Sequence, residues 1–204
     1  MNQQLQFDES THTYTLGGMI IPSVTQVLSS VGIVDYSRVP PHVLAEAAER
    51  GTAIHRACRF LDENDLDESV LCPWIIPYLE AWKKFKLLHN PGFVLIERPL
   101  TACINGMAFA GTPDRVGTMG DIPYIIEIKT GDESMERAWK VQTAAYAMLA
   151  PKRRTNPFQY RGASIQLFGD GTYRKSGDYA DPKDAQIFLA ALAIHVWKTN
   201  NSRG

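Results

Sequence analysis

The sequence predicts a mixed α/β domain of the α+β type, and three observations support this prediction. Apolar residues recur at three- and four-residue spacing in the first part of the chain and near its end, which indicates helices. The middle of the chain alternates with period two and contains hairpin turns, which indicates strands. With 204 residues, 45% hydrophobic and 21% charged, the chain has the size and composition of one globular domain spanning 1–204.

The N-terminal segment predicts a strand pair followed by the start of a helix. Thr11–Leu16 alternates, Gly17-Gly18 makes the turn, and Met19–Pro22 returns. Ser23 is then placed to cap a short helix, with Gln26 as its capping-box partner three residues later.

Two further helices are predicted before the strands of the middle begin. Pro41–Asp62 has its apolar residues on one stripe, as an amphipathic helix requires. Another helix follows Pro77, and its buried face is formed by Leu79, Trp82 and Phe85.

The middle of the chain predicts two consecutive hairpins. A strand over Phe93–Leu100 leads to Ile104–Met107, in which Asn-Gly tolerates the positive φ angles of a tight turn. Phe109–Thr118 and Pro123–Thr130 then pair around Met119-Gly120.

The C-terminal part returns to helical composition around one more strand pair. Asp is a favoured N-cap and Pro a favoured first residue, so a final helix begins at Asp181-Pro182. The elements are, in order, a helix over Asp132–Leu149, a strand over Arg161–Phe168, a short strand at Tyr173 after Gly169-Asp170-Gly171, and a final helix ending near Trp197.

The second hairpin combines acidic and basic residues in a pattern that is unusual for a strand. Glu127 and Lys129 project to one face, because side chains alternate with period two. If Met119-Gly120 are the turn residues, Asp114 lies opposite Ile125 and one diagonal step from Glu127. Two carboxylates and one ammonium then converge within reach of one divalent ion.

Phosphodiester hydrolysis needs such a set. Hard oxygen ligands hold Mg²⁺, for which Mn²⁺ is expected to substitute, and the ion activates water and neutralises developing charge. Lys129 can position the nucleophile or stabilise that charge, and the carbonyl of Ile128 can complete the coordination. Two neighbouring carboxylates are also expected to raise each other's pKa.

Several motifs then carry a family resemblance. Pro113-Asp114 followed by Glu127-Ile128-Lys129 resembles the PD-(D/E)XK nuclease superfamily. Arg50–His55 resembles the Gly-x-x-x-His helix motif of its RecB-like branch, and Gln142–Tyr146 resembles that branch's Gln-x-x-x-Tyr motif. Pro22–Thr25 before a helix is similar to the opening of phage-type exonucleases and of the mitochondrial genome maintenance exonuclease.

The resemblance implies a restriction-endonuclease-like core, in which a central mixed sheet is flanked by helices. It also implies a role for each matching position. The implied metal ligands are His55, Asp114, Glu127 and the carbonyl of Ile128; the implied catalytic residues are Asp114, Glu127 and Lys129; and the residues expected to contact the substrate are Gln142, Tyr146 and Thr130.

The function expected from this set is that of a Mg²⁺-dependent DNA exonuclease acting in phage or bacterial recombination, repair or replication. Its expected partners are DNA that is single-stranded or has a free end, and a single-strand-binding or annealing protein or a helicase. Three alternatives stay open: a structure-selective or flap endonuclease with the same site, an inactive nucleic-acid-binding accessory module, and a small-molecule phosphohydrolase.

Each residue also has a plainer interpretation. His55 can be a core histidine on an apolar stripe, Asp114 a turn residue, and Glu127 with Lys129 an ion pair on an edge strand. Glu97 is a further acidic group that can lie near the site. Lys152–Arg154 is either a solvated loop or a contact to the DNA backbone.

Composition limits the remaining possibilities. A net charge of −1 argues against coating nucleic acid by bulk electrostatics. Cys58, Cys72 and Cys103 cannot form the four-cysteine iron–sulfur site that some RecB-like relatives contain. No apolar run approaches the ~20 residues of a membrane span, and Met1–Ser10 is too polar for a secretory signal, so a cytoplasmic protein is expected.

Overall fold

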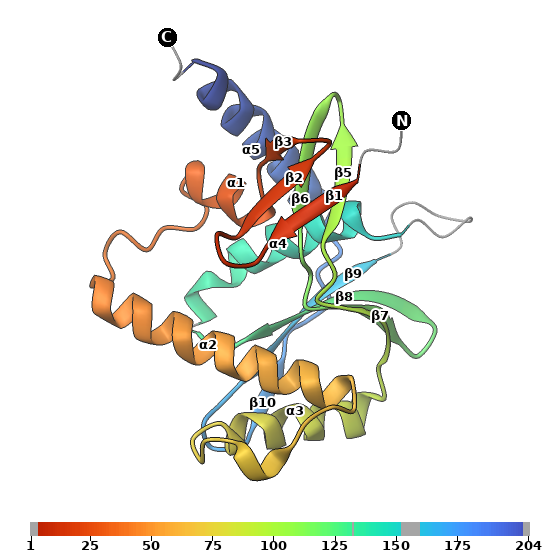
Figure 1. The fold of residues 1–204 in the computed structure, drawn as a ribbon. Helices are drawn as coiled ribbons and strands as arrows, with labels where there is room; N and C mark the ends of the chain where they lie inside the picture. The colour runs from red at the N-terminus through yellow and green to blue at the C-terminus, as the bar shows by residue number, and fades with distance from the viewer. Residues whose placement is uncertain (1–3, 132, 152–159, 202–204) are drawn as a thin grey trace.

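A five-stranded mixed sheet with helices on both faces forms the centre of the fold in this computed structural model, which describes residues 4–131, 133–151 and 160–201 (Figure 1). The pair β8–β9 is parallel, and the other neighbouring strands are antiparallel. The mixed sheet and its flanking helices confirm the predicted α+β class. The strands lie in the order β10 (Tyr173–Lys175), β9 (Arg161–Leu167), β8 (Ile122–Lys129), β7 (Arg115–Met119) and β4 (Gly92–Ile96).

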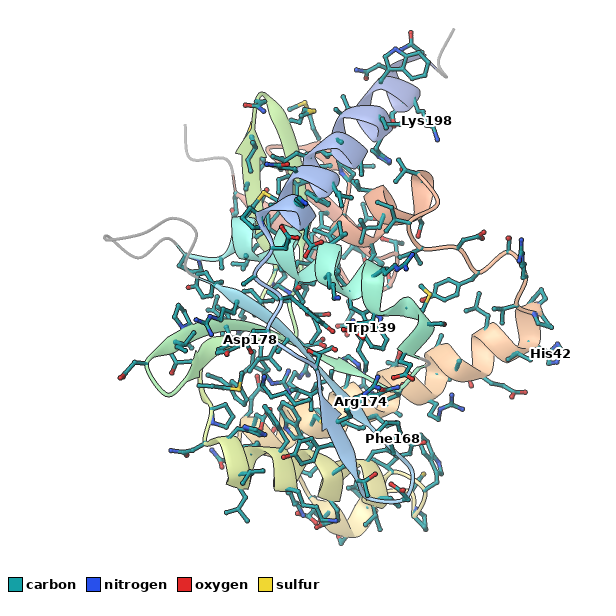
Figure 2. All side chains as sticks on the ribbon, turned by 180° about the vertical axis from the view of Figure 1, so that it is seen from behind. His42, Trp139, Phe168, Arg174, Asp178 and Lys198 are labelled. Atoms are coloured by element: carbon teal, nitrogen blue, oxygen red, sulfur yellow. The ribbon has the colours of Figure 1, made fainter. Side chains whose placement is uncertain are left out.

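Strand β8 is buried on both faces, and its side chains enter two separate cores. Ile125 packs with the helices α1 (Val24–Ser30), α4 (Glu136–Leu149) and α5 (Pro182–Asn201). Figure 2 shows α4, which includes the labelled Trp139, between the sheet and α5. The next side chain along the strand, Ile126, packs on the other face with α2 (Pro41–Asp62) and α3 (Ile76–His89).

The strands β4 to β7 form one long hairpin, which includes β5 (Leu100–Ile104) and β6 (Met107–Gly111). Its outer half pairs Ile96 with Arg115, and its inner half pairs Leu100 with Gly111. Within each pair, the two residues are equally far from the predicted Asn-Gly turn, so the hairpin keeps one register across the break in the strands. A small sheet of β1 (Leu5–Asp8), β2 (Thr13–Leu16) and β3 (Met19–Ile21) packs beside β6 (Figure 1).

Two strands that were predicted to be continuous are each interrupted in the structure. Phe93–Leu100 is interrupted because Glu97 has a left-handed backbone, with φ 45°, and because Pro99 has no N–H to donate. Phe109–Thr118 is interrupted at residues 112–114, where Pro113 likewise lacks a donor. Glu97 and Asp114 therefore lie beside strand ends rather than within strands, whereas Glu127 lies within β8.

The predicted turn of the next hairpin is wrong by one position. Met119 pairs with Ile122, so the two turn residues are Gly120 and Asp121 instead of Met119-Gly120. Gly120 takes a positive φ of 59°, a conformation that is least costly for glycine. The register shifts by two residues, which keeps Asp114 on the predicted face of the hairpin.

The helices differ from the predictions mainly at their ends. The capping box of Ser23 and Gln26 is confirmed at α1. The helix α4 begins only at Glu136, after a 3₁₀ turn over Glu133–Met135, and α5 continues to Asn201. A second 3₁₀ turn covers Glu68–Val70. Residue 132 and the basic segment Lys152–Arg154 lie outside the described residues.

Within the described ranges, no helix has the length and apolar character needed to cross a membrane.

The close pairing of β4 with β7 leads to a stability prediction. Gly117→Ala is expected to lower the free energy of unfolding by about 1–3 kcal/mol, because the new methyl group has no room to move into. Its Cβ would lie 2.1 Å from the carbonyl oxygen of Gly92, which is backbone. Gly177→Ala is the matched control, because a Cβ there meets nothing within 4 Å. Equal urea midpoints for the two variants would contradict the tight pairing.

Candidate metal centre

Asp114 lies where the two hairpin registers meet, and each register places another carboxylate directly opposite. On the β4 side, the N–H of Glu97 donates to the carbonyl oxygen of Asp114 at 3.1 Å. On the β8 side, the N–H of Asp114 donates to Oε1 of Glu127 at 3.1 Å. Three acidic residues therefore form one row across three neighbouring strands.

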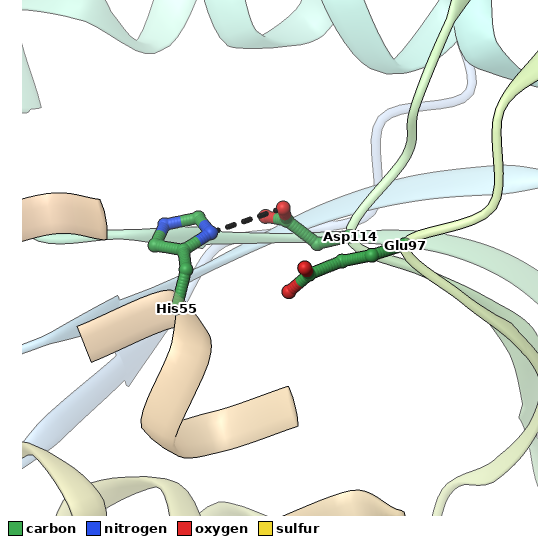
Figure 3. A group of neighbouring side chains, drawn as sticks. All are labelled: His55, Glu97 and Asp114. Carbon is green, nitrogen blue, oxygen red and sulfur yellow. Dashed lines mark hydrogen bonds and ion pairs between the residues drawn. The ribbon is translucent and has the colours of Figure 1, made fainter. Parts of the chain in front are cut away.

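The helix α2 adds a histidine to this row (Figure 3). Ile54, Ala57 and Cys58 bury the apolar stripe of α2 in the core, which leaves His55 directed toward Asp114. Nδ1 of His55 lies 3.1 Å from Oδ1 of Asp114.

His55, Glu97 and Asp114 each offer a ligand atom, and these atoms all lie within 4.8 Å of one another. This cluster can hold a metal ion. The predicted ligands His55 and Asp114 are thus brought together, and Glu97 joins them.

The other predicted ligands lie next to this cluster but have different contacts. Glu127 accepts from the backbone of Asp114 through Oε1 and from Nζ of Lys129 through Oε2, the latter at 3.0 Å. The N–H of Ile128 donates to Oδ2 of Asp114 at 2.7 Å, which orients that carboxylate. Coordination by Glu127 or by the carbonyl of Ile128 stays a prediction.

A chain of hydrogen bonds links the acid row to α4. Nζ of Lys129 also donates to Oε1 of Gln142 at 3.0 Å, and Nε2 of Gln142 donates to the Tyr146 hydroxyl at 3.2 Å. Tyr146 packs closely on Gly111, where an added Cβ would lie 2.6 Å from the ring. Gln142 and Tyr146 therefore reach the site together, as their spacing of four predicts.

Thr130 directly follows β8 and lies close to α2. A Cβ at Gly51 would lie 3.7 Å from Oγ1 of Thr130, an ordinary van der Waals distance, so the helix lies near the strand end at Gly51. This contact places the two sequence motifs that contain Gly51 and Lys129 side by side.

The two central carboxylates have opposite pKa shifts. Burial would raise the pKa of Asp114, but the charges of His55, Lys129 and Arg115 and the hydrogen bond from His55 lower it to about 2. Burial and the negative charge of Asp114 raise the pKa of Glu127 to about 7, although Lys129 opposes this shift. The expectation of a raised pKa is therefore wrong for Asp114, because the charges of three nearby cations outweigh the effects that raise it.

The carboxylates also favour the protonated forms of the cationic residues His55 and Lys129. Burial would lower the pKa of His55, but Asp114 outweighs this effect and raises it. Burial would likewise lower the pKa of Lys129, and Glu127 and Asp114 raise it instead. The pKa of Glu97 is raised by burial and then by Asp114. The acid row and the surrounding cations thus hold each other in their charged forms, with Glu127 and Glu97 the most easily protonated.

Glu97 was expected only as a nearby acid, although the sequence contains a stronger signal. Counting back from the Asn105-Gly106 turn places residue 97 directly opposite residue 114, because the hairpin keeps one register. Arg115 and Asp62, which lie behind the cluster, have no comparable signal, since one comes from β7 and the other from the end of α2.

Comparisons with known proteins add little to this geometry. No family profile matches the chain, and no curated protein matches it. Among solved structures, the crystal structure of SSO0001 is similar over 70% of this chain and 73% of its own, with 15% identity and a TM-score of 0.35. A similarity this distant supports no argument about activity, so the chemistry of the site rests on its own residues.

The opposite pKa shifts predict opposite effects of two substitutions on the metal-free protein. At about pH 8, Glu127→Gln is expected to raise the free energy of unfolding and Asp114→Asn to lower it, each on the order of 1–3 kcal/mol. The folded-state pKa of Glu127 is raised from 4.5 to about 7, so its ionisation removes stability as the pH rises between these values. The pKa of Asp114 is lowered from 3.8 to about 2, so its stabilising effect is lost only as the pH falls through that range.

Urea unfolding in the presence of chelator, at about pH 8 and about pH 4, measures both effects. The advantage of Glu127→Gln should disappear at the lower pH. Glu49→Gln, on an exposed part of α2, is the control and should match the parent at both values. Two variants shifted in the same direction at the higher pH would refute this account of the charges.

Proposed function

We propose that this protein is a Mg²⁺-dependent deoxyribonuclease, a DNA exonuclease of the RecB-like PD-(D/E)XK type. One observation supports the proposal most. The cluster of His55, Glu97 and Asp114 can hold a metal ion, and the ion pair of Glu127 with Lys129 lies directly beside it. The order of the resembling motifs along the chain favours the same chemistry.

The donor set of the cluster suits a divalent cation. Glu97 and Asp114 supply hard oxygen atoms of the kind that Mg²⁺ and Mn²⁺ prefer. The imidazole of His55 is a ligand that transition metals accept readily, so Mn²⁺ is expected to substitute for Mg²⁺. When bound, such an ion lowers the pKa of water and offsets the negative charge of a phosphodiester in its transition state.

Lys129 has the position required to assist this reaction. Its ammonium group is held by Glu127 and Gln142, so little side-chain freedom is left to be lost during catalysis. A fixed positive charge beside the acid row can stabilise the charge that develops on the phosphate. Glu127 then has two roles, to orient Lys129 and to extend the acid row.

The substrate side of the proposal rests on α4 and the end of β8. Gln142 bonds to Lys129, Tyr146 bonds to Gln142, and Thr130 follows Lys129 in the chain; these three residues are proposed to contact DNA that is single-stranded or has a free end. The proposed setting is recombination, repair or replication in a phage or bacterium, with a helicase or a single-strand-binding or annealing protein as partner. A flap endonuclease would use the same residues and differ in its products.

The proposal predicts cleavage of labelled DNA that depends on Mg²⁺ or Mn²⁺ and stops in excess chelator. Asp114→Asn should abolish cleavage, because it removes a charged ligand. Lys129→Ala should lower the rate by roughly 10² or more, as expected for a group that stabilises developing charge. Lys83→Ala is the matched control, because Lys83 pairs with Glu68 and Glu80 at the surface and should not affect the rate.

A gel of products from 5′- and 3′-labelled, single- and double-stranded DNA distinguishes the outcomes. Mononucleotides or short products from an end support an exonuclease, and cuts at junctions indicate the flap endonuclease. Cleavage that persists unchanged in chelator would overturn the metal mechanism. Binding without cleavage of any DNA or RNA would indicate the accessory module.

A further inference from the structure

The residue after Asp114 is an arginine that is buried completely behind the metal centre. Side chains alternate along a strand, so Arg115 points to the face of the sheet opposite to that of Asp114. None of its side chain is exposed. Burying a guanidinium group is costly unless charged and polar partners compensate it, so its partners define its role.

Arg115 contacts both acidic residues of the cluster. Its Nη1 donates to the carbonyl oxygen of Asp114 at 2.7 Å and to Oε1 of Glu97 at 3.4 Å. The guanidinium carbon also lies 5.7 Å from the ring centre of Trp82 and 5.8 Å from that of Phe93. Two aromatic rings therefore lie near the guanidinium group, and one of its nitrogen atoms, Nη1, contacts both acidic residues.

The carbonyl oxygen of Asp114 links the backbones of the two ligands through a hydrogen bond from Glu97. The oxygen of Asp114 accepts from Arg115 and also from the N–H of Glu97. Glu97 has a φ of 45°, a left-handed conformation that is costly for a residue with a side chain and persists only where its surroundings enforce it. Arg115 is placed to enforce it, because it binds both the side chain of Glu97 and the carbonyl group that Glu97 contacts.

Asp62, the last residue of α2, holds the other end of the guanidinium group. Nε of Arg115 donates to Oδ2 of Asp62 at 2.8 Å. The Asp62 side chain is fully buried and also accepts from Nζ of Lys86 at 2.6 Å and from Nε1 of Trp82 at 3.1 Å. Three donors from two further elements fix this carboxylate, so Arg115 has a rigid anchor.

We propose that Arg115, anchored by Asp62, is the positioning residue of the metal centre and sets the spacing between Glu97 and Asp114. This inference rests on the proposed function, because it concerns the same cluster. A lysine cannot take this role, since a single ammonium group lacks the planar fork that reaches Asp62 and the two ligands at once. The charge near the cluster is the same with either residue, so Arg115→Lys changes only the geometry.

The test is calorimetric titration of the metal-free protein with Mn²⁺ alone, beside a melting curve of each variant. Arg115→Lys is expected to weaken Mn²⁺ binding by about 10-fold or more, as is usual when a residue that orients metal ligands is replaced. Phe188→Leu is the control for lost stability, because Phe188 is fully buried against Phe109, on the face of the sheet opposite to Arg115. It should lower the melting temperature and leave Mn²⁺ affinity unchanged.

A second variant keeps the test decisive if Arg115→Lys does not fold. Asp62→Asn combined with Arg115→Met removes both buried charges together, a replacement that often preserves stability, while Asn keeps an acceptor for Trp82. This double variant should also bind Mn²⁺ about 10-fold more weakly or worse. Affinity equal to that of the parent in a folded variant would overturn the role of Arg115 alone. Absence of Mn²⁺ and Mg²⁺ binding by the parent would overturn the proposed function and this role with it.

Discussion

The burial of negative charge in one row is the constraint on which the rest of this structure depends. Glu97 and Asp114, at the break of the long hairpin, lie side by side with Glu127 on β8, and in this row like charges repel each other and lose contact with water. The fold offsets this charge with cations from three directions. His55 lies on α2, Lys129 lies two residues after Glu127 on β8, and Arg115 lies on the opposite face of the sheet. The charges of these three residues lower the pKa of Asp114 to about 2.

Two neighbouring strands of the long hairpin, β4 and β7, are interrupted at the same register position, where the acid row lies. β4 ends before Glu97, and β7 begins after Asp114, so both acids lie in a break of the long hairpin. The hydrogen bond between them keeps the register across the break. β8 continues through the same level, is covered on both faces, and brings Glu127 and Lys129 to the row from the centre of the sheet. In a site of this kind, packing and hydrogen bonds hold the side chains in position before any ligand binds.

The sequence predicts the class of fold and most of the site, because these depend on local chemistry. Period-two alternation predicts that Glu127 and Lys129 share a face, and helical spacing predicts that Gln142 and Tyr146 meet the site together. The turn was misplaced by one residue, yet Asp114 stayed on the correct face, because the register shifted by an even number of residues.

Other features of the site depend on contacts between distant parts of the chain and were not predicted. The breaks at Pro99 and Pro113 are visible only as prolines within otherwise continuous strand patterns. The ligand position of Glu97 follows from the Asn-Gly turn only once the hairpin is known to keep its register through the break. The burial of Arg115 on Asp62 joins β7 to the end of α2, and no periodicity or spacing encodes such a pairing. The opposite pKa shifts of Asp114 and Glu127 follow from the same arrangement, because only the folded chain places three cations around one of the two acids.

The central claim is that His55, Glu97 and Asp114 form a metal centre, and diffraction tests it most directly. Crystals of the protein soaked in Mn²⁺ would be measured at a wavelength where manganese scatters anomalously. The account predicts one anomalous peak among these three side chains, at about 2.0–2.3 Å from the coordinating oxygen and nitrogen atoms. Crystals without a peak at this cluster, or with peaks only at surface carboxylates elsewhere, would contradict it.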